Sequence, residues 1–474
     1  MQKSDREKES DRSESQWLRP GCCRRFLRKS ILHSTVPPRV RHTVDNLLYS
    51  TAMETSPTEP TQIDRLSSLP DALLVSVLSL LPTRLAARTS VLSRRFQYLW
   101  KASPAVDISF SDPRISFFKK KAMANGVLLS RQPSNPLLRL HLDVGHPASL
   151  DLPHSFISSL LAHAHSLGLR HLTLNGEGLA EDLQPIVCSG FSISSLQSLS
   201  ISVNSYFSGI ITLPSGTTLT RLRSLSIRPP VSSAQVEQLL FKLCCLNHLQ
   251  LSHFQSTAAI VNLSSLTVKK LELLDFGHFE EGTCSVRLFM PSLEFFYLSK
   301  RYSKNLPHIH GGIPLLRKSV ITVDYLYPEH VSAVTQLLNC ISHVEELSLD
   351  LKERSVYPFC NLLEQGKEAP AFPNLKLLDV HMCFHEHNFE AVVSLLHRSP
   401  ALQSLKLVHK APEKLNLWPK KKRKMNDWRS KLPRNVDGNY QYAYFSNLHL
   451  KENNEGFMKL LNKSSTPKKL KAHN

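Results

Sequence analysis

Between residues 63 and 104, apolar side chains recur at the spacing of short helices. Five apolar residues at the start of this block lie at positions i, i+1, i+4, i+5 and i+8. Residues at this spacing lie on one face of a helix. These residues are Leu73, Leu74, Val77, Leu78 and Leu81. A Ser68-x-x-Asp71 capping box with Pro70 predicts the start of this helix, and Pro82 predicts its end.

Two further helices are predicted after Pro82. Thr83 can cap one that runs to about Leu92, and Ser93 can cap another that carries Phe96 and Trp100. Three helices in so short a stretch barely form a core. We therefore expect much of their apolar surface to be covered by a partner protein.

Beyond Asn135 the pattern changes to a repeat. The frame Leu-x-x-Leu-x-Leu, with aliphatic or aromatic substitutes, begins at Leu137, Leu169, Leu196, Leu222, Leu246, Leu271, Leu293, Val344, Leu375 and Leu402. A degenerate copy begins at Leu316, with Ser319 in its second apolar place. Successive copies lie 22 to 32 residues apart, and leucine-rich repeats recur every ~20–29 residues.

Each copy predicts a short strand whose first, fourth and sixth residues point inward, followed by a helical or irregular return. Stacked copies would form a parallel sheet over one continuous core, with the strands on a concave side. Helical returns are predicted at 233–243, 330–338 and 389–397. The uneven spacing favours an irregular α/β solenoid over a regular horseshoe.

The residues between the inward positions project onto the concave face of this predicted sheet. They form a mixed polar surface with aromatic anchors, which suits a protein ligand. We expect the target-binding residues to include His248, Gln250, Phe295, Tyr297, Glu346, Asp350, Asp379 and His381. The copy that begins at Leu271 also places Asp275 on this face.

The helical block resembles the F-box family of plant proteins. Three motifs carry the resemblance at the family's spacing: Leu-Pro-Asp at 69–71, Leu-Pro-Thr at 81–83 and Ser-Val-Leu-Ser-Arg-Arg at 90–95. Leu85 departs from the pattern where many members carry an acidic residue, and Phe96 departs where Trp is common. The repeats are similar to the leucine-rich arrays that follow the F-box in a large plant family.

This resemblance implies a substrate-recognition subunit of an SCF-type ubiquitin ligase, which itself catalyses nothing. The F-box would bind a Skp-type adaptor and, through it, cullin and RING subunits, while the repeats would bind a protein target for ubiquitination. The implied adaptor-binding residues are Leu69, Pro70, Leu73, Leu74, Leu78, Leu81, Pro82, Val91 and Leu92. The alternative is a nuclear protein-interaction scaffold that acts outside the ligase.

The cysteine spacing and the absence of catalytic motifs argue against a metal-binding protein or an enzyme. The nine cysteines include no Cys-x-x-Cys pair, so neither a zinc site nor a disulfide framework is predicted. No nucleophile elbow, phosphate-binding loop or His-Glu-x-x-His motif is present, and we expect neither catalysis nor a cofactor. His308-x-His310-Gly-Gly is predicted to be a turn.

Hydropathy and the N-terminal residues bear on the cellular location. No apolar run approaches the ~20 residues of a membrane-spanning helix, and the charged N-terminus lacks the apolar stretch of a secretory signal. We therefore expect a protein of the nucleus, the cytoplasm or both.

The net charge of +19 is concentrated near the C-terminus. From Lys410 to Asn474, 16 Lys and Arg residues stand against 5 Asp and Glu residues, a net charge of +11. Five basic residues after Pro419 resemble a monopartite nuclear import signal: Lys420, Lys421, Lys422, Arg423 and Lys424. We prefer this interpretation to nucleic-acid binding, because no recognised nucleic-acid-binding fold accompanies the run.

The sequence thus predicts four parts. Residues 1–60 are rich in charged residues, Ser, Thr and Pro and are predicted to form a disordered extension. The F-box is expected at 63–104, the leucine-rich repeats at 135–410, and a basic segment at 411–474.

Overall fold

The computed structural model describes part of the chain between residues 68 and 446. The described residues are 68–112, 115–129, 131, 135–145, 153–177, 180–204, 210–214, 216, 219–228, 231–252, 260–275, 285–300, 308–324, 326, 330–352, 355, 359, 362, 370–382, 389–409 and 442–446. The predicted extension at 1–60 and the basic run at 420–424 therefore lie outside the described residues. The chain divides into two compact units, Met1–Leu81 and Pro82–Asn474.

The described part of the first unit contains the predicted leucine helix, α4 (Asp71–Leu78). Its N-cap is Pro70, whose carbonyl oxygen accepts hydrogen bonds from the backbone N–H groups of Leu73 and Leu74 at 3.0 and 3.1 Å. The prediction that Ser68 caps this helix is wrong, since no described side chain caps it and Asp71 is its first residue. At that position the Asp71 carboxylate is well placed for the positive end of the helix dipole.

The second unit opens with short helical segments. These are α5 (Thr83–Arg88), the 3-10 turn η2 (Thr89–Val91), α6 (Phe96–Leu99) and the 3-10 turn η3 (Trp100–Ala102). Thr83 does not cap α5 as predicted, because its hydroxyl oxygen instead accepts the backbone N–H of Asp107 at 2.7 Å. Ser93 does accept the backbone N–H of Phe96, at 3.4 Å, next to the start of α6.

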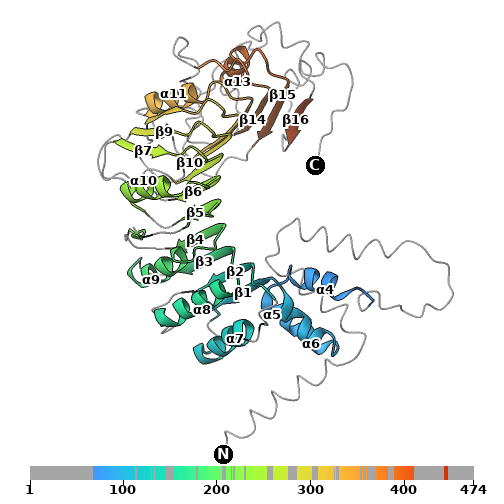
Figure 1. The fold of residues 1–474 in the computed structure, drawn as a ribbon. Coiled ribbons are helices and arrows are strands. Elements are labelled where there is room, and N and C mark those ends of the chain that lie inside the picture. Colours follow the sequence, from blue (N-terminus) through green and yellow to red (C-terminus); the bar gives the residue numbers. More distant parts are fainter. Residues whose placement is uncertain are drawn as a thin grey trace, which may run out of the picture. The chain divides into compact units, whose positions relative to one another are not determined.

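A parallel sheet of thirteen strands dominates the second unit, with its strands in chain order (Figure 1). The strands are β1 (Ala105–Ser109), β2 (Arg139–Asp143), β3 (His171–Glu177), β4 (Ser198–Asn204), β5 (Ser224–Ile227), β6 (His248–Ser252), β8 (Lys270–Leu274), β10 (Phe295–Lys300), β12 (Lys318–Val323), β13 (Glu346–Leu351), β14 (Leu377–Met382), β15 (Ser404–His409) and β16 (Tyr442–Ser446). The predicted largely parallel sheet is confirmed, and β1 and β16 extend it beyond the repeats expected at 135–410.

Helices connect many of these strands. They are α7 (Phe117–Leu129), α8 (His154–Ser166), α9 (Ala180–Phe191), α10 (Ser233–Lys242), α11 (Val331–Cys340) and α13 (Phe389–His397). The last three correspond to the three predicted helical returns. Within the second unit, α8, α9 and α10 follow one side of the sheet (Figure 1).

A second, three-stranded parallel sheet was not predicted. It contains β7 (Ile260–Ser264), β9 (Ser285–Phe289) and β11 (His308–Gly312), in the order β11-β9-β7. Helix α10 packs against β7, and α11 packs against β11. The small sheet therefore takes the place that helices occupy between earlier strands, and the turn predicted at His308–Gly312 is a strand.

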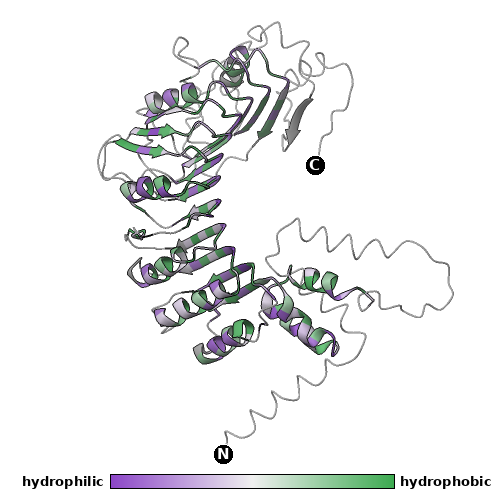
Figure 2. Cartoon of the chain, viewed as in Figure 1, coloured by the Kyte–Doolittle hydropathy of each residue, from purple (hydrophilic) through white to green (hydrophobic). Residues whose placement is uncertain are grey.

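The core follows the predicted inward positions, and polar and apolar residues alternate along the strands (Figure 2). One frame is shifted: Val268, Leu271 and Leu273 are the buried residues around β8, whereas Leu274 is only half-buried. The copy predicted to begin at Leu271 therefore begins at Val268. Ser319 fills the inward place expected for it. Its buried hydroxyl has no hydrogen-bond partner among the described residues, which lowers the stability of this copy.

Candidate interaction surfaces

The described helices before β1 leave several large apolar side chains in contact with solvent. In the first unit, Leu73 is 52% exposed and Leu80 is also exposed. In the second unit, Val91 is 75% exposed, and Leu92 and Tyr98 are exposed as well. Large aliphatic side chains at such exposure are costly to hydrate, so these positions suit a partner protein.

The other predicted adaptor-binding residues differ in their exposure to solvent. Leu74 and Leu78 are buried, so neither side chain is available for direct contact, and their part in adaptor binding would be to hold α4. The remaining positions are half-buried or exposed at the ends of helices: Leu69, Pro70, Leu81 and Pro82.

The residues around α6 are held by local contacts. Phe96 is buried, whereas the Trp100 indole N–H donates to the carbonyl oxygen of Gln97 at 3.1 Å. The Lys101 ammonium lies 5.6 Å from the Tyr98 ring centre and 5.8 Å from the Trp100 ring centre. The Lys101 ammonium is thus near enough to both rings for a weak cation–π attraction.

A second candidate surface is the polar face of the large sheet. Near its first edge, His141 Nδ1 lies 2.8 Å from Asp107 Oδ1, and His141 Nε2 lies 2.9 Å from Asn175 Nδ2. The hydrogen bond with Asp107 is the largest cause of a raised His141 pKa, and the charges of Asp107 and Asp143 add to it against partial burial. When His141 is protonated, Nε2–H is a donor, and the Asn175 amide can accept it only by presenting its oxygen.

A pH dependence follows from the raised His141 pKa. A raised native pKa adds stability that is complete below the unfolded value of about 6.5 and is lost as pH rises through the native value. We expect NMR titration to give a His141 pKa above that of a free histidine, and Asp107→Asn to lower it. An unchanged pKa in Asp107→Asn would contradict the assigned cause.

The middle of the polar face contains a connected set of hydrogen bonds. Ser226 donates to Gln250 Oε1 at 2.5 Å, and Gln250 Nε2 donates to Glu272 Oε2 at 2.8 Å. Glu272 also lies 3.4 Å from His248 Nε2 and 2.5 Å from the Lys270 ammonium. His248 and then Lys270 lower the Glu272 pKa to about 2, against the opposing effect of burial, so Glu272 is ionised at neutral pH.

The aromatic pair of β10 stands next to this network. Phe295 is opposite Lys270 on one side and Lys318 on the other, and Tyr297 is opposite Glu272. The Lys270 ammonium lies 5.2 Å from the Phe295 ring centre. Both rings are half-buried, so each can offer one side to a partner.

The later strands carry paired charges. The Lys318 ammonium lies 2.8 Å from Glu346, and Asp379 contacts His381 at 2.9 Å and Lys406 at 3.1 Å. Asp350 is opposite His381 in the register of β13 and β14. All eight predicted target-binding residues thus lie on β6, β10, β13 or β14, and all are half-buried.

The sequence prediction missed two residues of this face, Lys270 and Glu272. The shifted frame at β8 placed Asp275 there instead, but Asp275 follows the strand and has a positive φ of 49°. Beginning the frame at Val268 would have found both residues, since they alternate with the buried Leu271 and Leu273.

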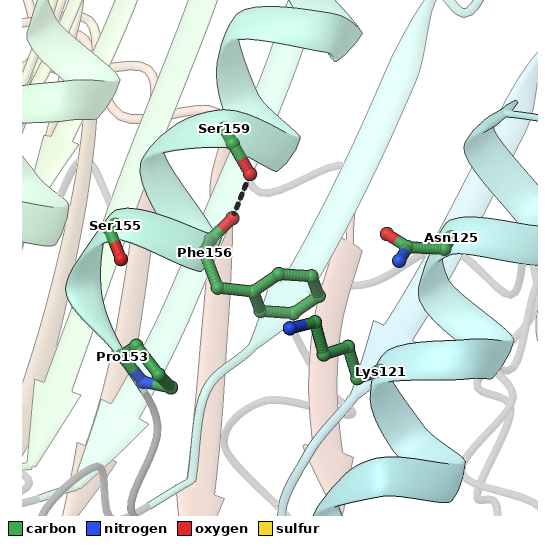
Figure 3. Close-up of a pocket in the computed structure, with 6 residues that line it drawn as sticks. All are labelled: Lys121, Asn125, Pro153, Ser155, Phe156 and Ser159. Atoms are coloured by element: carbon green, nitrogen blue, oxygen red, sulfur yellow. Dashed lines mark hydrogen bonds between the residues drawn. The ribbon is translucent and has the colours of Figure 1, made fainter.

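A surface hollow of about 340 Å³ between α7 and α8 does not provide a further site (Figure 3). Its lining residues are Lys121, Asn125, Pro153, Ser155, Phe156 and Ser159. The Lys121 ammonium lies 5.3 Å from the Phe156 ring centre, and that ring packs edge-on against Phe110 at 6.1 Å. The Phe156 ring therefore takes part in packing α8 against α7 and against the residue that follows β1.

The described residues contain neither a metal site nor a membrane-spanning helix. No group of three His, Cys, Asp or Glu side chains in this part of the chain could hold a metal ion. None of its helices combines the length and the apolar character that crossing a bilayer requires.

Comparison with known proteins defines the class of the helical block. Residues 66–104 match the F-box domain family, which covers α4, α5 and α6. The chain therefore contains an F-box domain, and its relatives in Arabidopsis thaliana include F-box/FBD/LRR-repeat proteins.

The relatives differ in how much of the chain they match. A putative F-box/FBD/LRR-repeat protein is 39% identical over 117 residues, 24% of this chain and 26% of its own length. A putative F-box/LRR-repeat protein is 34% identical over 114 residues, 24% of this chain and 22% of its own length. A second putative F-box/FBD/LRR-repeat protein is 24% identical over 378 residues, 73% of this chain and 74% of its own length. The chain thus matches only about a quarter of the length of the first two.

Proposed function

We propose that this chain is the target-binding subunit of an SCF-type ubiquitin ligase. The observation that carries the proposal is the exposure of Leu73 and Val91 within a segment that matches the F-box family. F-box domains generally bind Skp-type adaptors, which gives these side chains a partner to cover them. The adaptor would in turn connect the chain to cullin and RING subunits.

The rest of the chain would select the target. We propose that the parallel sheet belongs to a leucine-rich-repeat solenoid, over roughly the predicted 135–410, with the polar face as its concave surface. The alternation of buried leucines with half-buried polar residues supports this assignment. Phe295, Tyr297 and the paired charges around them would contact the target protein.

The proposed mechanism is proximity. Holding the target and the ligase on one chain raises the effective concentration of target lysines near the charged conjugating enzyme. No side chain of this protein needs to take part in the chemistry, so we propose a non-catalytic subunit without a cofactor.

The proposal is tested by purifying the tagged full-length chain from plant cells and probing for adaptor and cullin. We expect both to co-purify in stoichiometric amounts. Recovery of neither would favour the alternative, a nuclear scaffold that acts outside the ligase.

We also propose that the basic residues 420–424 direct part of the protein to the nucleus. The position of this run directly after a proline, in a segment of net charge +11, supports the proposal. Alanine at all five positions should shift the protein to the cytoplasm, and an unchanged distribution would contradict an import signal.

A further inference from the structure

Three arginines line the edge of the large sheet at which its strands begin. Arg139 is the first residue of β2, Arg170 directly precedes β3, and Arg223 directly precedes β5. All three side chains are exposed. We call these three residues the arginine row.

Backbone hydrogen bonds align Arg170 and Arg223 across the sheet, two strands apart, with Gln197 between them. Arg139 lies one residue further along its strand, opposite His171. The N–H of Arg170 donates to the carbonyl oxygen of Leu138 at 3.1 Å, and the N–H of Gln197 donates to that of Arg170 at 2.7 Å. The N–H of Arg223 then donates to the carbonyl oxygen of Gln197 at 2.8 Å. From β2 to β5 there are three strand spacings of ~4.8 Å each, so the row spans about 14 Å.

No described carboxylate forms an ion pair with the arginine row. The segments that lead into β2 through β6, residues 135–138, 167–170, 192–197, 219–223 and 243–247, contain no Asp or Glu. Within the described part of the chain, the three guanidinium groups make no hydrogen bond and no ion pair. The charges of Arg139 and Arg170 also act on the neighbouring His171, whose pKa is lowered first by burial and then by these two arginines.

The later strands of the same edge differ in this respect. Lys269 lies 2.9 Å from Glu294, and Lys376 lies 3.0 Å from Glu345. Lys318, at the start of β12, lies 2.8 Å from Glu346. These three lysines are thus each paired with a glutamate of a neighbouring strand, whereas the cations of the arginine row are left for an external anion.

We propose that the arginine row binds an acidic, extended peptide segment of the protein that the sheet recognises. Guanidinium groups bind carboxylates in bidentate geometry, and an extended peptide rises ~3.3 Å per residue, so about four or five residues would cover the row. Gln197, Ser198 and Ser224 lie between and beside the arginines and can hydrogen-bond the peptide backbone. This inference rests on the proposed function, because it specifies the chemistry of the target.

The composition of the edge favours a peptide over a nucleic acid. Single-stranded nucleic acids are bound largely by stacking of bases on aromatic side chains. Among the described residues of the segments that lead into β2 through β6, none is aromatic. Amide and hydroxyl groups at Gln197, Ser198 and Ser224 instead suit peptide hydrogen bonding.

The test measures binding of fluorescein-labelled octaglutamate by fluorescence anisotropy at low salt. All proteins are full length and carry alanine at 420–424, so that the basic run does not contribute. The test variant is Arg139→Gln, Arg170→Gln, Arg223→Gln. The matched control is Lys269→Gln, Lys318→Gln, Lys376→Gln, which changes the net charge equally but removes only paired cations.

We expect the arginine variant to weaken octaglutamate binding by about 100-fold, since each exposed ion pair contributes roughly fivefold. The lysine variant should bind within about threefold of the parent, because the glutamates it frees oppose binding only from a distance. Equal weakening in both variants, or no binding by the parent, would overturn the proposal. A single-stranded oligonucleotide of equal charge that binds more tightly than octaglutamate, with the same dependence on the three arginines, would also overturn it.

Adaptor binding separates this inference from the proposed function. The arginine variant should retain adaptor binding and the thermal unfolding midpoint of the parent. The three substitutions change only exposed side chains at the edge of the sheet, outside the F-box match. If the parent binds octaglutamate but no adaptor, the arginine row stands and the ligase assignment fails. If the parent binds adaptor but not octaglutamate, the ligase assignment stands and the proposal for the arginine row fails.

Discussion

Replacing Leu73 and Val91 together by aspartate should reduce binding of a purified Skp-type adaptor by more than 100-fold while the parallel sheet stays folded. Both side chains are exposed in the free chain, so their replacement removes little from its own packing. Burying an aliphatic side chain at an interface contributes roughly 1.5–3 kcal/mol, and a buried carboxylate without a partner adds a further penalty. Isothermal titration calorimetry measures the loss.

The matched control changes Phe241 and Leu266 to aspartate. These residues are 91% and 67% exposed on the second unit and lie outside the F-box match. Adaptor binding by this control should equal that of the wild-type protein. Retained affinity in the Leu73 and Val91 variant would contradict the assignment of these residues to the adaptor surface. Leu74 is left unchanged because it is buried, and its replacement would mix folding with binding.

Gly311→Ala should lower the free energy of unfolding of the second unit by about 2–3 kcal/mol, the upper part of the range for forced overpacking. A Cβ at Gly311 would lie 2.6 Å from the backbone oxygen of Leu288 and 2.9 Å from its Cβ. A backbone atom cannot be displaced as a flexible side chain can, so β11 would have to separate from β9. Urea denaturation followed by circular dichroism measures the change.

Gly312→Ala provides the comparison at the next residue of the same strand. No atom lies within 4 Å of a Cβ placed there, so its effect should stay within about 0.5 kcal/mol. Equal destabilisation by the two substitutions would contradict this explanation. It would mean that the loss of stability does not come from the contact with Leu288.

The sequence predicted the large sheet well because each strand repeats one hydrophobic frame. Leucines at the first, fourth and sixth places are buried in copies as far apart as those of Leu140 and Leu405. The same criterion missed β1, which alternates Val106 and Ile108 but lacks the leading leucine. Around β8 the sequence fits two frames, one that begins at Val268 and one that begins at Leu271 and places Leu274 inward. The local pattern alone did not distinguish between them.

The small sheet could not be predicted for a different reason. Strand β11 contains Gly311 and Gly312, a pair that ordinarily favours a turn. Its strand structure depends on β9, whose close approach admits only a glycine at 311. Contacts between segments distant in sequence thus determine this element, and they leave no periodic signal.

The candidate surfaces were predicted unevenly. The motifs of the helical block identified the F-box region, yet only the structure separates the exposed Leu73 from the buried Leu74 and Leu78. The pairing of lysines with glutamates between strands likewise depends on register, because Lys318 and Glu346 are 28 residues apart. That the arginine row lacks such ion pairs could therefore be recognised only from the structure.

Hydrogen exchange of the chain, alone and with a purified Skp-type adaptor, tests most directly whether an outside protein covers the F-box helices. We predict a one-to-one complex in which amides of α4, α5 and α6 exchange more slowly, while those of β4 through β15 keep their rates. Unchanged exchange in these helices, or slower exchange confined to the large sheet, would contradict the proposed function.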